Sequence, residues 1–241
     1  MKYIIVIAIT FLISACHPNT PFEMDSITPV PVRESYISLQ DSTGILLKIG
    51  SAVVIDDGYA ITSRHVCEGS NGMKGYMAGG MEFPITEVVL SDSFDLALFE
   101  IPCGVGKPIK IGEKVRTGEQ VFSVGTSNGS AIYEGIVQET DIIIHHVDID
   151  LPNPSSRDAK GRPITHGFVC EGDFKKGFSG GPIVNSRGEL VGIIQGYTTE
   201  FLSDTNVTEL ETSKTYGTGY HIEDILNEVK SMTEKKHNRC K

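Results

Sequence analysis

Residues 177–196 read GFSGGPIVNSRGELVGIIQG, a glycine-rich turn around Ser179 that leads into two apolar runs separated by polar residues. Glycines at 177, 180 and 181 permit backbone torsions that a side chain would forbid, so the turn can close tightly around one hydroxyl. In such a turn, the N–H groups of Gly177 and Ser179 can point toward an oxyanion that forms beside that hydroxyl. The apolar runs predict short strands.

Two upstream segments supply the groups that a reactive serine needs. AITSRHVC places His65 just after an apolar run, and DLALFEI begins at Asp95. A serine hydroxyl is a weak nucleophile at neutral pH and needs an imidazole to accept its proton, while a buried carboxylate fixes the imidazole tautomer. The sequence therefore predicts Ser179 as nucleophile, His65 as base and Asp95 as its carboxylate.

Together these segments resemble trypsin-like serine peptidases of the HtrA/Deg type. The similarity runs from about Ser51 to Ile222 and includes GSAVVIDDGYAITSRHVCEG, DLALFEI, GEQVFSVGTSNG and the serine segment, with all three catalytic positions in order. The resemblance implies an all-β, chymotrypsin-like fold of two six-stranded antiparallel β-barrels with a C-terminal helix. It also implies a serine endopeptidase that works through an acyl-enzyme intermediate without a cofactor, on protein or peptide substrates. The oxyanion hole would consist of Gly177 and Ser179.

The sequence departs from the family at Phe178, where HtrA-like members usually carry asparagine and trypsin carries aspartate. A phenyl group cannot form the salt bridge to a freed N-terminus that activates trypsin, so we expect no zymogen activation of that kind. No segment resembling a PDZ domain follows the serine segment.

The resemblance places a substrate pocket between the loop before Ser179, the strand after it and a later glycine-rich strand. The candidate pocket residues are Asp173, Phe174, Gln195, Tyr197 and His221. Asp173 would favour a basic substrate side chain and His221 an acidic one. The two aromatic residues would favour an apolar one, and we expect a small or medium apolar residue at the cleavage site. The alternative function is a protease-fold protein that binds peptides without cleaving them, because Phe178 disturbs the oxyanion loop.

Short β-rich runs separated by Gly, Asp, Asn and Ser recur from Tyr36 onward, which indicates an all-β domain over 36–241. The first barrel is expected at about 36–110 and the second at about 116–221, because 104–118 is rich in glycine and lysine and lacks alternation. Apolar residues at helical spacing predict a helix over about 222–232. They are Ile222, Ile225, Leu226, Val229 and Met232.

The N-terminus has the pattern of an export signal. Lys2 is followed by an uncharged stretch that is too short for a confident membrane span, and residues 1–15 therefore predict a signal peptide. Small residues before Cys16 resemble the lipobox of bacterial lipoproteins, with Cys16 diacylated; an ordinary cleaved signal or a short uncleaved anchor are the alternatives. Residues 16–35 are proline-rich and predict an extended tether. The domain would then lie in the bacterial cell envelope, held at a membrane by lipid.

Charge, cysteine content and histidine spacing bear on nucleic-acid binding, disulfide bonds and metal binding. The formal net charge of -10 disfavours nucleic-acid binding. Once Cys16 is assigned to lipid, four cysteines allow three pairings; we favour Cys67 with Cys103 and Cys170 with Cys240, and four thiols are the alternative. No metal site is expected, because the adjacent His145 and His146 on a strand would point to opposite faces.

Overall fold

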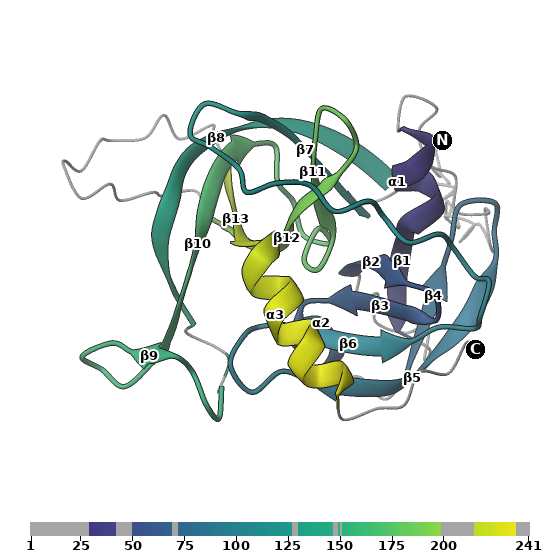
Figure 1. The fold of residues 1–241 in the computed structure, drawn as a ribbon, viewed down its shortest axis with the longest axis horizontal. Coiled ribbons are helices and arrows are strands. Elements are labelled where there is room, and N and C mark those ends of the chain that lie inside the picture. The colour runs from purple at the N-terminus through teal and green to yellow at the C-terminus, as the bar shows by residue number, and fades with distance from the viewer. Residues whose placement is uncertain are drawn as a thin grey trace, which may run out of the picture.

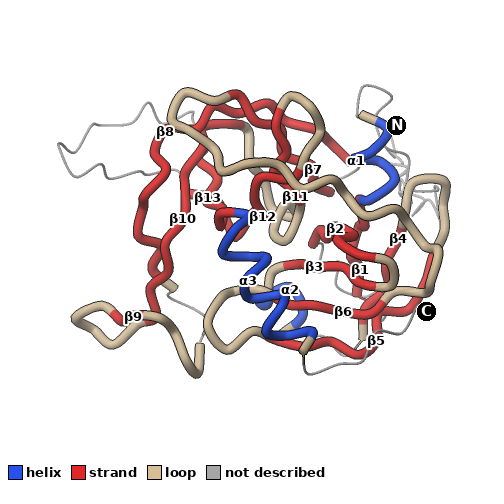
Figure 2. The backbone as a smooth tube through the Cα atoms, viewed as in Figure 1, coloured by secondary structure: helices blue, strands red, loops and turns tan. Residues whose placement is uncertain are grey.

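A computed structural model describes residues 29–41, 50–68, 72–126, 130–146, 149, 151–198 and 215–234. The predicted signal peptide, Cys16 and Cys240 lie outside these residues. The described chain forms two bodies of β-strands, with a C-terminal helix packed on the second (Figures 1 and 2). Among the described residues, no helix is long and apolar enough to cross a membrane.

The first body is a closed six-stranded antiparallel barrel with the strand order β1-β2-β3-β6-β5-β4. Its strands are β1 (Tyr36–Asp41), β2 (Gly50–Asp56), β3 (Tyr59–Thr62), β4 (Met73–Tyr76), β5 (Glu82–Leu90) and β6 (Ala97–Glu100). Ala52 and Val54 of β2 belong to one apolar cluster, while Val53 between them belongs to another that includes residues of the second barrel. Because successive strand residues face opposite sides, β2 reads as a continuous apolar run with both faces buried.

The second body is also antiparallel, with the order β13-β12-β11-β7-β8-β10-β9, and pairing of β13 with β10 closes six of these strands into a barrel. The strands are β7 (Gln120–Thr126), β8 (Ser130–His145), β9 (Ser156–Arg157), β10 (Pro163–Gly172), β11 (Pro182–Asn185), β12 (Leu190–Thr198) and β13 (Thr215–His221). The short β9 lies outside the barrel at the left of Figure 1. The predicted fold of two six-stranded barrels with a C-terminal helix is confirmed.

Helix α1 (Val30–Ser35) occupies the end of the segment that the sequence predicted as an extended tether. Proline is tolerated in the first turn of a helix, and this turn contains one. Val32 and Ser35 are fully buried, and the Ser35 hydroxyl donates to the Val32 carbonyl. Burial of Val32 against the barrels therefore outweighs the extended preference of the proline-rich sequence, and the tether prediction is wrong for these six residues.

The chain crosses between the barrels over residues 101–119, which contain no strand. Ile109 donates its N–H to the Val54 carbonyl of the first barrel. Leu190 of the second barrel donates to the Lys110 carbonyl and accepts from Gly112 N–H. The crossing segment thus binds both barrels through backbone hydrogen bonds and limits their relative movement.

Helix α3 (Ile222–Thr233) packs on β12 and β13. Ile222, Ile225, Val229 and Met232 are buried, whereas Leu226 is partly exposed. The Glu228 carboxylate of α3 accepts a hydrogen bond of 2.6 Å from Ser91, in the loop after β5. The C-terminal helix therefore reaches from the second barrel to the loop that carries Asp95.

The cysteine pairings expected from the sequence are wrong. Cys67 and Cys170 both carry thiols, whereas Cys103 is disulfide-bonded. Burial raises the pKa of the Cys170 thiol to about 12. Each of these thiols packs in the core of its barrel, where cysteine behaves as a small apolar residue.

Candidate active site

His65 and Asp95 form a close pair in the first barrel. His65 lies on the single turn α2 (Arg64–Cys67), directly after β3, and Asp95 lies just before β6. The His65 Nδ1–H donates to Asp95 Oδ2 at 2.7 Å, and the His65 backbone N–H donates to Asp95 Oδ1 at 2.9 Å. The Asp95 side chain is completely buried, while the imidazole keeps about a third of its surface exposed, at 34%. A buried carboxylate at Nδ1 leaves Nε2 as the proton-accepting atom.

Ser179 lies in a tight turn between β10 and β11. Gly177 and Gly180 have φ values of 102° and 81°, which residues with side chains rarely adopt. The backbone N–H groups of Phe178, Gly180 and Gly181 donate to carbonyl groups. Within the described part of the chain, the N–H groups of Gly177 and Ser179 donate to nothing. The turn therefore leaves two amide donors, those of Gly177 and of Ser179 itself, without an acceptor among the described residues.

The serine turn presses directly against the segment that leads to His65. The Ser179 carbonyl accepts from Ser51 N–H at 2.9 Å, and the Gly177 carbonyl accepts from the Ser51 hydroxyl at 2.7 Å. A Cβ on Gly180 would lie 2.6 Å from the Ser63 nitrogen. These contacts join the serine turn to β2 and bring it close to Ser63, two residues before His65.

Among the hydrogen bonds of the described residues, none joins Ser179 Oγ to His65 Nε2. Such contacts are commonly long in a free enzyme and shorten when substrate binds. The structure thus brings together His65 and Asp95 in bonding geometry, with Ser179 on an adjoining turn.

Phe178 anchors the serine turn in the second barrel. Its side chain is 1% exposed, and its ring lies over Gly125 of β7, where a Cβ would collide with it. Tyr133 and Phe174 pack beside it, with ring centroids 5.2 and 6.4 Å away. An aromatic ring at this position therefore fixes the turn by apolar packing where trypsin uses a salt bridge.

The structure places the five residues predicted to line a substrate pocket in different surroundings. Asp173 is 58% exposed and pairs with Lys175, so it points to solvent. Phe174 is buried in the core of the second barrel. His221 is buried too, and its Nε2–H donates to the Thr140 carbonyl; its pKa is lowered, chiefly by burial. Tyr197 is half exposed.

Gln195 has a contact that the sequence did not predict. Its side-chain Nε2 donates to Asp95 Oδ2 at 3.2 Å. Tyr220 also reaches Asp95, because its hydroxyl accepts the Asp95 backbone N–H at 3.2 Å. The Tyr220 pKa is raised well above its usual value by burial and by the Asp95 charge. No local sequence pattern indicates either contact, since they join residues 100 and 125 positions apart.

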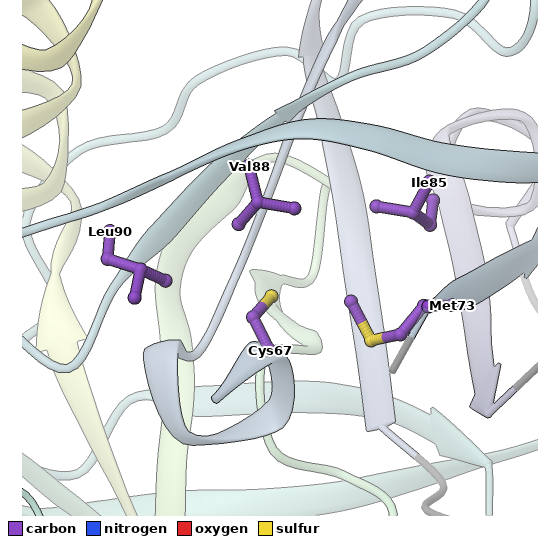
Figure 3. A pocket seen from close by; sticks show the side chains of 6 residues that line it. Cys67, Met73, Ile85, Val88 and Leu90 are labelled. Atoms are coloured by element: carbon purple, nitrogen blue, oxygen red, sulfur yellow. The ribbon is translucent and has the colours of Figure 1, made fainter. Parts of the chain in front are cut away.

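A cavity of about 250 Å³ lies beside α2 (Figure 3). Its walls come from α2, β4 and β5 and from the segment between α2 and β4, namely Cys67, Gly72, Met73, Ile85, Val88 and Leu90. These residues carry no charged group, and neither His65 nor Asp95 is among them. In the described parts of the chain, no three His, Cys, Asp or Glu residues cluster in a way that could hold a metal ion.

Comparison with known proteins gives the family. The family model described as "Trypsin-like peptidase domain" matches residues 50–193, which is more than half of the chain. The chain belongs to the trypsin-like peptidases. Serine protease Do-like HtrB of Bacillus subtilis is 29% identical over 159 residues, covering 63% of this chain and 31% of that protein. Protease Do-like 1, chloroplastic, of Arabidopsis thaliana is 27% identical over 182 residues, covering 73% and 38%. This trypsin-like chain thus spans between about a third and two fifths of the length of these relatives.

Solved structures share the fold of this trypsin-like chain. The active form of the Rv3671c protease of M. tuberculosis aligns with a TM-score of 0.64 and 20% identity, over 89% of this chain and 92% of the other. The MamO protease domain of Magnetospirillum magneticum aligns with a TM-score of 0.60 and 22% identity, over 82% and 97%. At such identities, the likeness supports the two-barrel fold alone.

Proposed function

We propose that this protein is a serine endopeptidase that uses Ser179, His65 and Asp95. The observation that carries the proposal is the fully buried Asp95 carboxylate, which accepts hydrogen bonds from both Nδ1 and the backbone of His65. A surface carboxylate beside a histidine would not fix the ring in this way. Here one carboxylate determines both the tautomer and the orientation of the imidazole, as a general base requires.

The proposed reaction proceeds through an acyl-enzyme. Ser179 Oγ attacks the carbonyl carbon of the peptide bond as its proton passes to His65 Nε2. The N–H groups of Gly177 and Ser179 receive the negative charge on the carbonyl oxygen, each with an expected contribution of about 3 kcal/mol to lowering the barrier. His65 returns the proton to the leaving amine, and water then attacks the ester by the same route and frees Ser179.

Substrate is proposed to bind as an extended strand along β12. Pairing of β12 with β11 ends at Ile193, whereas pairing with β13 continues to Thr198. Among the described residues, no strand pairs with one edge of β12 beyond Ile194, and an added substrate strand would use that edge for main-chain hydrogen bonds. Exposed Tyr197 lies on this stretch and would contact substrate side chains, which supports a preference for small or medium apolar residues.

A fluorophosphonate probe tests the proposal directly. We expect the folded protein to form one covalent adduct, which mass spectrometry of the digested protein places on Ser179. The Ser179→Ala variant and heat-unfolded protein are the controls and should stay unlabelled. A folded protein that binds peptides but forms no adduct would contradict the peptidase proposal and leave the peptide-binding alternative.

The proposed location is the bacterial cell envelope, with a diacylated Cys16 as membrane anchor. The support is the N-terminal sequence, in which an uncharged stretch is followed by the small residues Ser14 and Ala15 and then by Cys16. Cys16→Ser should move the protein from the membrane fraction to the soluble fraction, because the body carries a net negative charge that anionic lipids repel. Cys67→Ser changes a cysteine of the barrel and should leave the distribution unchanged. Unaltered membrane association of the Cys16 variant would contradict lipid anchoring.

A further inference from the structure

Ser91 is the first residue of the loop that carries Asp95, between β5 and β6. Only 1% of its surface is exposed. Its backbone N–H donates to the Leu96 carbonyl at 2.9 Å, and this bond closes the loop around Asp95. The two ends of the loop are thus joined at Ser91, and a contact that holds Ser91 also holds the loop.

The Ser91 hydroxyl uses its full hydrogen-bonding capacity. Its oxygen accepts from the backbone N–H groups of Ser93 and Phe94 at 3.0 and 2.9 Å. A hydroxyl has two lone pairs and one proton, so the proton is left for the Glu228 carboxylate, 2.6 Å away. Because an ionised carboxylate can only accept and a backbone N–H can only donate, the direction of each bond is fixed. Glu228 thereby turns both lone pairs of the hydroxyl toward the backbone of the loop.

The Ser91 carbonyl contacts the turn that carries His65. Arg64, directly before His65 on α2, donates from its guanidinium to this carbonyl at 2.5 Å. The same guanidinium donates to Glu68 at 2.7 Å, and the Arg64 side chain is only 11% exposed. A charged donor bound at both Ser91 and Glu68 has little freedom to move. Ser91 therefore joins the histidine turn to the loop that carries Asp95.

Glu228 comes from a helix that is itself fixed on the second barrel. It lies on α3 between the buried residues Ile225 and Val229, and α3 packs on β12 and β13 (Figure 1). The hydrogen bond from Ser91 joins residues 137 positions apart. The second barrel thus presents a carboxylate to the loop of the first barrel from a rigid, packed element.

We propose that Ser91 and Glu228 are positioning residues for the pair of His65 and Asp95. Through Glu228, helix α3 sets the direction of the Ser91 hydroxyl. Through that hydroxyl and its carbonyl, Ser91 holds the Asp95 loop and the histidine turn at one spacing. Both residues act through the backbone rather than on the reacting atoms. The role rests on the proposed peptidase function and adds the C-terminal helix to the parts of the chain that determine the rate.

The first test removes the acceptor on α3 and then restores it. Glu228→Met keeps the side-chain length but cannot accept the Ser91 proton. It should lower kcat about fivefold, the effect of one hydrogen bond, and change KM less than about twofold, because the substrate edge of β12 is unaltered. Glu228→Gln keeps an oxygen that can accept from Ser91 and should restore kcat to within about twofold of the unaltered protein.

Ser91→Ala removes all the bonds of the hydroxyl and should lower kcat about tenfold. The double variant of Ser91→Ala and Glu228→Met should be no slower than Ser91→Ala alone, because both changes act through the same hydroxyl. Glu234→Met is the matched control, since Glu234 is exposed at the C-cap of the same helix. Its kcat should equal that of the unaltered protein. A loss as large as that of Glu228→Met would overturn the proposal, because helix charge would then explain both results.

A second measurement does not need activity. In the Ser179→Ala protein, the proton between His65 Nδ1 and Asp95 gives a downfield NMR signal. Glu228→Met should shift this signal, whereas Glu228→Gln and Glu234→Met should not. If the unaltered protein neither cleaves peptides nor reacts with fluorophosphonate, the peptidase proposal fails, and this signal alone decides the role of Glu228. An unchanged signal in Glu228→Met, or a loss of activity confined to KM, would overturn the positioning role.

Discussion

Asp95→Asn should lower kcat by about four orders of magnitude while the protein stays folded. The reason lies in the neighbours of the carboxylate, which are all donors: His65 N–H, His65 Nδ1–H and Gln195 Nε2. An amide in place of the carboxylate has one acceptor and one donor end. Its NH2 group must therefore face either the His65 backbone N–H or the side of Nδ1 and Gln195.

Both orientations of the new amide harm the site. If its NH2 group faces Nδ1, the imidazole must carry its proton on Nε2, the atom that should accept the serine proton. If it faces the backbone N–H of His65, two donors oppose each other in a buried site and displace α2. The peptide cleavage rate and the rate of fluorophosphonate labelling should fall together.

Asp92→Asn is the matched control for this prediction. Asp92 lies in the same loop as Asp95 but is exposed. Asp92→Asn removes one negative charge, as Asp95→Asn does, from a position three residues earlier in the chain. We expect kcat to change less than about twofold, because exposed charges are screened by solvent. Equal losses in both variants would show that loop charge, rather than the buried hydrogen bonds of Asp95, governs the rate.

The sequence predicted the all-β class and the C-terminal helix because the features that specify them are local, whereas the two-barrel arrangement was implied by the family resemblance. The glycines around Ser179 and the alternating or continuous apolar runs of the strands can each be read within about ten residues. The helix α3 was predicted within one residue at its end because its apolar stripe repeats at helical spacing. Helix α1 was missed because its stability comes from the burial of Val32 against distant strands, which no local pattern records.

The candidate site was predicted only as far as residue types indicate chemistry. His65, Asp95 and Ser179 could be predicted because few other residue types perform their roles. The expected substrate-pocket residues follow from the family resemblance, and a resemblance does not give the packing that decides where each side chain points. Phe174 turned into the core because the neighbouring Gly172 and Gly217 leave room for its ring, and that space is visible only in three dimensions. The contact of Gln195 with Asp95 accompanies a β-bulge between Ile194 and Gly196 of β12, which is likewise a property of strand pairing.

Gly180→Ala should destabilise the protein more than a glycine-to-alanine substitution at any other glycine of the site. Gly180 has a positive φ, and its Cβ would meet Thr62 Oγ1, the Ser51 carbonyl oxygen and the Ser63 nitrogen. All three atoms belong to the first barrel, whereas Gly180 belongs to the second, so the methyl group would separate the barrels at the site. We expect a loss of at least about 3 kcal/mol in the free energy of unfolding, measured by urea denaturation.

Gly161→Ala separates the packing effect from the backbone effect. Gly161 has a φ of 77°, nearly that of Gly180, but no atom lies within 4 Å of its Cβ position. Its substitution should cost about 1 kcal/mol, the strain of a left-handed conformation alone. The difference between the two variants then measures the close approach of the barrels. Because Ser179 is adjacent to Gly180, fluorophosphonate labelling should be lost in Gly180→Ala under conditions where the variant is still folded, and kept in Gly161→Ala. Equal destabilisation of the two variants would contradict the close contact between the serine turn and the segment before His65.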